Sequence, residues 1–164
     1  MAHSFGTIYA SVVIKCNPDL VCGAVLLEPA AMLCHVPKMA KSFMYSFGPE
    51  GLRSPLSVLF RIEPHVAFTL RRHFDFCRYM LFVDDVRSFP AAILVSRGDT
   101  IMPSEDTLAH VKKIKNPLVS ASHFPPEVGG TTFQEHGGWC HDAHMNDIVF
   151  EALQDITRQA LKLH

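Results

Sequence analysis

Residues 2–29 (AHSFGTIYASVVIKCNPDLVCGAVLLEP) contain, in order, a serine between small residues, a helical pattern and a short apolar run. Apolar side chains stand at helical spacing in residues 7–16, and the pair Asn17-Pro18 predicts the end of that helix. Residues 24–27 (AVLL) are continuously apolar and are closed by Glu-Pro, which favours a strand buried on both faces. A helix followed by such a strand is typical of α/β proteins.

The remainder of the chain continues this alternation. Residues 91–96 (AAILVS) form a second apolar run, and Ser104 starts a predicted helix that extends to about Ile114. Pairs of proline and of glycine predict a loop over residues 117–130, and Thr131–Gln134 is a candidate strand. Strands that alternate with helices predict a mostly parallel sheet flanked by helices, which is an α/β fold.

Two further parts of the chain are predicted to be helical. Residues 31–88 show mixed helical patterns interrupted by prolines, and they hold seven of the twelve phenylalanines: Phe43, Phe47, Phe60, Phe68, Phe74, Phe76 and Phe82. A last helix is expected to begin at Asn146 or Asp147, since either side chain can cap it. Its apolar residues repeat every four positions: Ile148, Ala152, Ile156 and Ala160.

Composition favours a single globular domain over residues 1–164. The chain is 48% hydrophobic and 19% charged, with a formal net charge of −1, so it offers no positive field for a nucleic-acid partner. The longest apolar run, residues 21–27, is too short to span a bilayer, and no signal peptide is visible. The default prediction is therefore a cytoplasmic protein. The five cysteines form no Cys-x-x-Cys pair, which disfavours a thiol redox motif or a zinc ribbon.

Ser4 is the residue most suggestive of chemistry. Where a strand turns sharply into a helix, a serine at the turn projects its hydroxyl from the edge of the sheet. Such a turn is expected to crowd the residues two before and two after the serine, and here both are small, Ala2 and Gly6. The amide of Phe5 is expected at the start of the helix, where it can donate a hydrogen bond to an oxyanion.

The run Ala2-His3-Ser4-Phe5-Gly6 resembles the nucleophile elbow of the α/β-hydrolase family, with alanine where glycine is usual. Residues 17–29 are similar to the helix end and strand that follow the elbow in that family. Residues 93–103 (ILVSRGDTIMP) resemble the segment that bears the catalytic acid, with Asp99 four residues before the proline. The resemblance covers about residues 2–35 and 90–164, and it implies divisions at 1–35, 36–89 and 90–164, with the middle as a cap-like helical insertion.

The resemblance also implies a histidine base between the last strand and the final helix. Three histidines, His136, His141 and His144, lie in the segment EHGGWCHDAH before that helix. His144 stands four residues before the first apolar residue of the expected helix, so it is predicted to be the base. His141 is the second choice and His136 is the third.

Other interpretations of these residues stay open. Ser4 also fits an ordinary exposed serine near a terminus, and Asp99 also fits a turn before the next proline. Glu28 is a rival acid because it ends the preceding strand, where some relatives carry the carboxylate. The three histidines, with Asp142 or Cys140, also suggest a metal site; their spacing differs from that of two histidines on one helix face, and no metal is predicted.

The expected activity is that of a serine hydrolase acting on an ester, a thioester or a related acyl bond. By resemblance, Ser4 attacks the carbonyl, His144 takes its proton, Asp99 orients the imidazolium and the Phe5 amide holds the oxyanion. Neither a metal nor an organic cofactor is expected. Phenylalanines of the middle segment are more often core, but in a cap they can line a pocket for a small-molecule, apolar acyl substrate.

A second hypothesis is a truncated, catalytically inactive fragment with a binding role or none. The family places several strands ahead of the elbow, together with the loop that supplies a second oxyanion amide, and no such sequence precedes Ser4. The strand that carries Ser4 would consist of Met1-Ala2-His3, which is short for the centre of a sheet. This hypothesis expects the N-terminal strands to be missing and apolar edges to be exposed.

Overall fold

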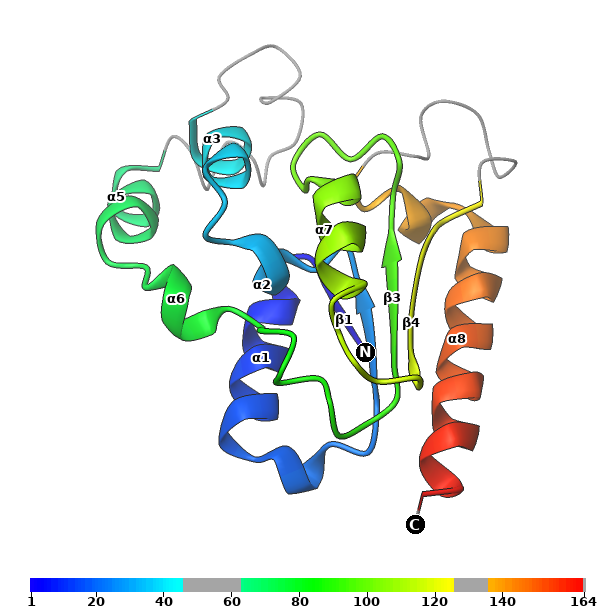
Figure 1. The fold of residues 1–164 in the computed structure, drawn as a ribbon. Helices are drawn as coiled ribbons and strands as arrows, with labels where there is room; N and C mark the ends of the chain where they lie inside the picture. The colour runs from blue at the N-terminus through cyan, green and yellow to red at the C-terminus, as the bar shows by residue number, and fades with distance from the viewer. Residues whose placement is uncertain (46–62, 126–135, 164) are drawn as a thin grey trace.

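The computed structural model describes residues 1–45, 63–125 and 136–163 (Figure 1). Within these residues the chain forms one sheet, of order β1-β2-β3-β4, in which every neighbouring pair of strands is parallel. The strands are β1 (Ala2–His3), β2 (Ala24–Leu27), β3 (Ala91–Val95) and β4 (Val119–His123). Helices connect successive strands, as parallel pairing requires, and the predicted α/β class with a parallel sheet is confirmed.

Helices cover both faces of this sheet (Figure 1). The helices α1 (Gly6–Cys16) and α7 (Ser104–Val111) pack on one face, and α8 (Ala143–Leu161) packs on the other. Within β2, Ala24 and Leu26 belong to the first core, whereas Val25 and Leu27 belong to the core beneath α8. All four side chains are buried. This two-sided burial explains why the strand is continuously apolar in sequence.

The middle segment holds short helices, as its sequence pattern predicts, together with turns and irregular stretches such as residues 80–90. It contains α2 (Ala30–Leu33), α3 (Pro37–Tyr45), α5 (Pro64–Arg72) and α6 (Phe76–Tyr79), while the 3-10 turns η1 (Pro18–Leu20) and η3 (Gly138–His141) lie elsewhere in the chain. Among the phenylalanines singled out above, Phe47 and Phe60 lie outside the described residues, as does the candidate strand Thr131–Gln134. No helix in the described part of the chain is long and apolar enough to cross a membrane.

The predicted loop over residues 117–130 is wrong for its first part, because β4 occupies Val119–His123. This strand pairs with β3 along its whole length and forms an edge of the sheet. Its three central side chains are exposed, so its sequence, VSASH, lacks the apolar run that revealed β2 and β3. Backbone hydrogen bonds to β3, rather than side-chain burial, hold it in place.

Two helix boundaries also differ from expectation. The final helix begins at Ala143, not near Asn146 or Asp147, because Asp142 caps it by accepting a hydrogen bond from the Met145 amide at 2.9 Å. The helix α7 begins at Ser104 as predicted but ends at Val111 instead of about Ile114. The Ser104 hydroxyl donates to the Ser96 carbonyl at 2.5 Å, which ties α7 to the end of β3.

Gly23 and Gly6 form a matched pair for testing how the sheet packs. A Cβ at Gly23 would lie 2.5 Å from Ile156 Cγ2 and 3.3 Å from the Pro90 carbonyl oxygen. Gly23→Ala is therefore expected to lower the free energy of unfolding by about 1–3 kcal/mol. Gly6→Ala meets no heavy atom within 4 Å, and is expected to raise the free energy of unfolding by about 0.4–1 kcal/mol. Urea unfolding of both variants measures these changes. Equal urea midpoints for Gly23→Ala and Gly6→Ala would contradict the close packing of α8 beside β2.

Candidate active site

Ser4 occupies the sharp turn between β1 and α1. Its backbone has φ +49°, a left-handed conformation that costs a non-glycine residue about 1–3 kcal/mol and is held only where the surroundings enforce it. The Ser4 amide donates to the Leu27 carbonyl at 2.9 Å, and the Ser4 carbonyl accepts from the Thr7 amide at 3.0 Å and the Thr7 hydroxyl at 2.6 Å. Both ends of the turn are thus fixed, and the Ser4 side chain stands at the carboxyl end of β1.

The prediction that the turn crowds the residues two before and two after Ser4 is wrong for Gly6. A Cβ there would meet no heavy atom within 4 Å, so the turn leaves room for a larger residue. On the other side, Ala2 is partly buried against the core and pairs with Leu26 in the sheet. Phe5 precedes α1 in a helical backbone conformation, which places its amide at the N-terminal end of that helix.

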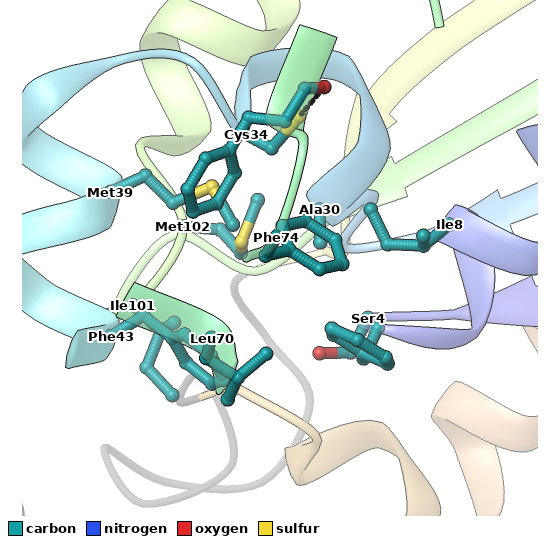
Figure 2. Close-up of a pocket in the computed structure, with 12 residues that line it drawn as sticks. Ser4, Ile8, Ala30, Cys34, Met39, Phe43, Leu70, Phe74, Ile101 and Met102 are labelled. Carbon is teal, nitrogen blue, oxygen red and sulfur yellow. Dashed lines mark hydrogen bonds between the residues drawn. The ribbon is translucent and has the colours of Figure 1, made fainter. Parts of the chain in front are cut away.

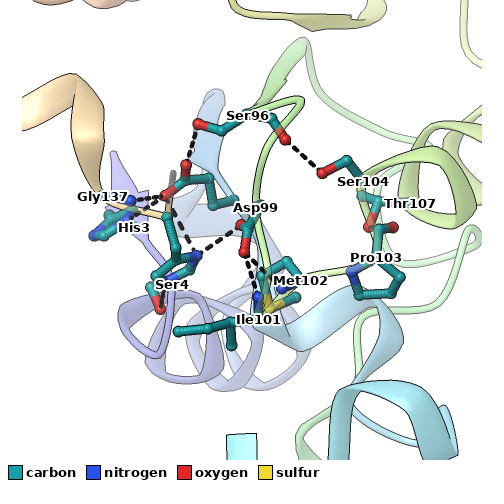
Figure 3. A network of polar contacts seen from close by, with 12 residues as sticks. His3, Ser4, Ser96, Asp99, Ile101, Met102, Pro103, Ser104, Thr107 and Gly137 are labelled. Atoms are coloured by element: carbon teal, nitrogen blue, oxygen red, sulfur yellow. Dashed lines mark hydrogen bonds and ion pairs between the residues drawn. The ribbon is translucent and has the colours of Figure 1, made fainter. Parts of the chain in front are cut away.

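His136 joins Ser4 to Asp99. The Ser4 hydroxyl lies 2.6 Å from His136 Nε2, and His136 Nδ1 lies 2.7 Å from Asp99 Oδ2. Because a carboxylate only accepts, Nδ1 carries the proton and Nε2 is left to accept from the serine. The other oxygen of Asp99, Oδ1, accepts from the Ile101 amide at 2.8 Å and the Met102 amide at 2.7 Å (Figure 3). These bonds fix the carboxylate, which in turn fixes the imidazole.

The structure corrects the choice of histidine. His144, the first choice, is exposed on the first turn of α8, and His141, the second, is exposed in η3. His136, the third choice, is the one in contact with Ser4 and Asp99. The physical reason is that α8 begins at Ala143, earlier than expected, so His144 lies within the helix and on its exposed surface.

Glu28 contributes a second carboxylate beside the same imidazole. Its side chain is fully buried, and its Oε2 accepts from His3 Nε2 at 2.8 Å and from the Gly137 amide at 2.7 Å. The Ser96 hydroxyl donates to its other oxygen. Glu28 Oε2 lies 3.5 Å from His136 Nδ1, farther than the carboxylate of Asp99. Glu28 is therefore an additional negative charge at the site, while Asp99 is the direct partner.

The sequence did not indicate His3 or Gly137 as members of this network. His3 adjoins Ser4 in sequence, but its partner Glu28 is 25 residues away. Gly137 has φ +77°, a conformation that glycine adopts without strain, and this directs its amide at Glu28 (Figure 3). The glycine that directly follows His136 is the feature of the sequence that could have indicated this part of the network.

Opposite charges and hydrogen bonds raise the pKa of His136 and lower the pKa of Glu28, in both cases against the effect of burial. Burial lowers the pKa of His136, but the hydrogen bond and charge of Asp99 and the charge of Glu28 outweigh it, and the net pKa is raised. Burial raises the pKa of Glu28, but the bond from His3, the charge of His136 and the bonds from Ser96 and Gly137 outweigh it, and the net pKa is lowered. Glu28 is thus ionised at neutral pH.

A small apolar hollow adjoins Ser4 and is partly open to solvent. Figure 2 shows the Ser4 hydroxyl pointing toward it, across from Leu70. Besides Ser4 the lining is apolar throughout: Phe5, Ile8, Ala30, Cys34, Met39, Phe43, Leu70, Phe74, Phe76, Ile101 and Met102. Burial raises the pKa of the Cys34 thiol to about 11, so this thiol stays protonated and is no rival nucleophile at neutral pH.

His141 and His144 are exposed, and within the described residues His136 is grouped with neither of them as a possible metal ligand. In the described part of the chain, the residues whose ligand atoms lie close enough to hold one ion are His3, Glu28 and His136.

Comparisons of the chain with models of protein families, with curated proteins and with solved structures found no match. The function is therefore inferred from the geometry of the site.

Proposed function

We propose that the chain is a serine hydrolase of the α/β-hydrolase type that cleaves an ester or a related acyl bond. The observation that carries this proposal is the unbroken line of contacts from Ser4 Oγ through His136 to Asp99, at 2.6 and 2.7 Å. A nucleophile bonded to a base, with the base oriented by a third group, is the arrangement that activates a hydroxyl for acyl transfer.

The mechanism assigns one role to each group. Ser4 Oγ attacks the acyl carbon while its proton passes to His136 Nε2. The imidazolium is stabilised by its direct hydrogen bond to Asp99 and by the negative charge of Glu28, 3.5 Å from Nδ1. The Phe5 amide, at the N-terminal end of α1, donates to the carbonyl oxygen as it becomes negative. The imidazolium then returns its proton to the leaving oxygen, and a water activated by His136 cleaves the acyl-enzyme.

The apolar hollow supports an aliphatic acyl group as the part of the substrate nearest Ser4. Burying each methylene contributes about 0.8 kcal/mol, which is about fourfold in kcat/KM per methylene if the gain is realised in the transition state. Hydrolysis of p-nitrophenyl esters by the full chain tests both parts of the proposal. The kcat/KM is expected to rise from acetate to hexanoate, with the monosuccinate ester slower because its charge must enter an apolar space.

The alternative, a catalytically inactive protein, predicts that none of these esters is hydrolysed. It is favoured by the length of β1, since the strand ahead of the Ser4 turn pairs with β2 through two residues, Ala2 and His3. Absence of turnover above the buffer rate for every ester in the panel would contradict the hydrolase. Turnover that does not depend on the length of the acyl group would instead exclude the hollow as the acyl site.

Hydrolysis is expected to fall as the solution is acidified, with a midpoint above the ordinary histidine pKa of 6.5. The base must be unprotonated, and Asp99 and Glu28 raise the pKa of His136, so the protonated form already accumulates at a higher pH. Glu28→Gln removes one negative charge and is expected to move the midpoint to lower pH. Measuring kcat/KM against pH in chelator-containing buffers checks this, with exposed His144→Gln as the control. A wild-type midpoint below 6.5 would contradict the electrostatic account.

A further inference from the structure

A set of metal ligands overlaps the proposed base. His3, Glu28 and His136 each offer a ligand atom, and the three atoms lie within 4.8 Å of one another. His3 Nε2 is 2.8 Å from Glu28 Oε2, and His136 Nδ1 is 3.5 Å from the same oxygen. Two imidazoles and one carboxylate are the ligands that zinc uses in sites that keep a fourth position open for water.

The separations suit a tetrahedral ion. Bonds of about 2.0–2.2 Å from zinc to nitrogen and oxygen place neighbouring ligand atoms about 3.3 Å apart. The separations from Glu28 Oε2 to the two imidazole nitrogens, 2.8 and 3.5 Å, lie on either side of that value, and all three ligand atoms lie within 4.8 Å of one another, so the two imidazoles adjust around Glu28 when an ion binds. The His3 side chain is 29% exposed, which leaves the cluster reachable from solvent.

The cluster is also held in place before any ion arrives. The His3 ring is packed edge-on against Trp139, with ring centroids 5.4 Å apart, and its centroid lies 5.3 Å from that of His136. Glu28 is fully buried and is fixed by the Gly137 amide and the Ser96 hydroxyl. Its charge, with that of Asp99 close by, offsets the charge of a divalent cation. In the triad His3 acts only through its hydrogen bond to Glu28, whereas in a metal site it is a direct ligand.

We propose that Zn²⁺ binds His3, Glu28 and His136 and thereby switches the hydrolase off. The binding rests on the ligand geometry alone, whereas the switch rests on the proposed function. In the active arrangement His136 carries its proton on Nδ1, toward Asp99, and accepts from Ser4 at Nε2. The metal replaces the proton on Nδ1 and breaks the hydrogen bond from Nδ1 to Asp99, so the proton of the neutral ring stands on Nε2 instead. A ring protonated at Nε2 cannot accept the proton of Ser4.

Direct binding tests the site without reference to activity. Zn²⁺ is titrated into the full chain in competition with a chromophoric chelator, and one competing site is expected. His3→Gln, whose amide can still donate to Glu28 but is a poor zinc ligand, is expected to weaken that site by about tenfold or more. Matched controls are His144→Gln and Cys140→Ser, which remove an exposed imidazole and an exposed thiol from the same region. Affinity in His3→Gln equal to that of the wild type would overturn the site.

Two further readouts test the switch. Long-range ¹H–¹⁵N spectra are expected to show the proton of His136 moving from Nδ1 to Nε2 when Zn²⁺ is added, and an unchanged tautomer would overturn the coordination. The ratio of ester hydrolysis in Zn²⁺ to that in EDTA is expected to be low for the wild type and near one for His3→Gln. Binding without inhibition in an active enzyme would overturn the switch. If no variant hydrolyses any ester, the proposed function fails, while the titration and the spectra still decide the metal site.

Discussion

Replacing His136 by glutamine is expected to reduce kcat for ester hydrolysis by about a million-fold, close to the loss of the whole triad. Glutamine can fill much of the same space and can hydrogen-bond to Asp99, but its amide cannot take the proton from Ser4. Without a base 2.6 Å from Oγ, the hydroxyl remains a weak nucleophile. Steady-state hydrolysis of a p-nitrophenyl ester measures the loss.

The matched control for this change is His144→Gln. His144 is exposed on the first turn of α8, so its replacement is expected to leave kcat within about twofold and the free energy of unfolding within about 0.5 kcal/mol. Urea unfolding of both variants separates a chemical loss from a folding defect. If His144→Gln abolished hydrolysis while His136→Gln remained active, the site geometry would be refuted and the first choice made from the sequence would stand.

Ser4→Ala is expected to reduce kcat by a similar factor, about a million-fold, because the acyl-enzyme can no longer form. Alanine retains a Cβ in the same left-handed turn, and the backbone bonds to Leu27 and Thr7 do not involve the lost hydroxyl. The fold and the apolar hollow are therefore expected to persist, and a product-like fatty acid should still bind. Isothermal titration with hexanoate measures that binding beside the kinetic assay.

A serine far from the site provides the control for Ser4. Ser122 is exposed on the edge strand β4, and Ser122→Ala is expected to keep the wild-type kcat. Residual activity in Ser4→Ala near the wild-type rate would mean that another group attacks the ester. In that event the contacts between Ser4, His136 and Asp99 would serve structure only.

The sheet was predictable where its strands are buried on both faces. The runs AVLL and AAILV are apolar because β2 and β3 are covered by α1 and α7 on one side and α8 on the other. The edge strand β4 was missed because its side chains face solvent and its stability comes from the backbone. Local sequence carries no apolar signal for a strand of that kind.

The candidate site was predictable in part. The turn at Ser4 follows from local pattern and Asp99 from the resemblance of residues 93–103 to an acid-bearing segment, and in the structure His136 contacts both residues. The histidine was misassigned because the Asp142 cap was overlooked, which put the expected helix start too late. The pair His3–Glu28 joins two strands, and a contact between strands depends on register that a single sequence does not reveal. The open space beside Gly6 does not support crowding as the reason for a small residue at that position.

Covalent labelling with a fluorophosphonate tests the central claim most directly. An activated serine displaces fluoride and becomes phosphonylated on Oγ, so mass spectrometry of the digested protein identifies the nucleophile. We expect one adduct per chain on Ser4, no adduct in Ser4→Ala, and labelling of His136→Gln slowed to near the background rate. An adduct on a different residue, or labelling of Ser4→Ala equal to that of the wild type, would contradict the account.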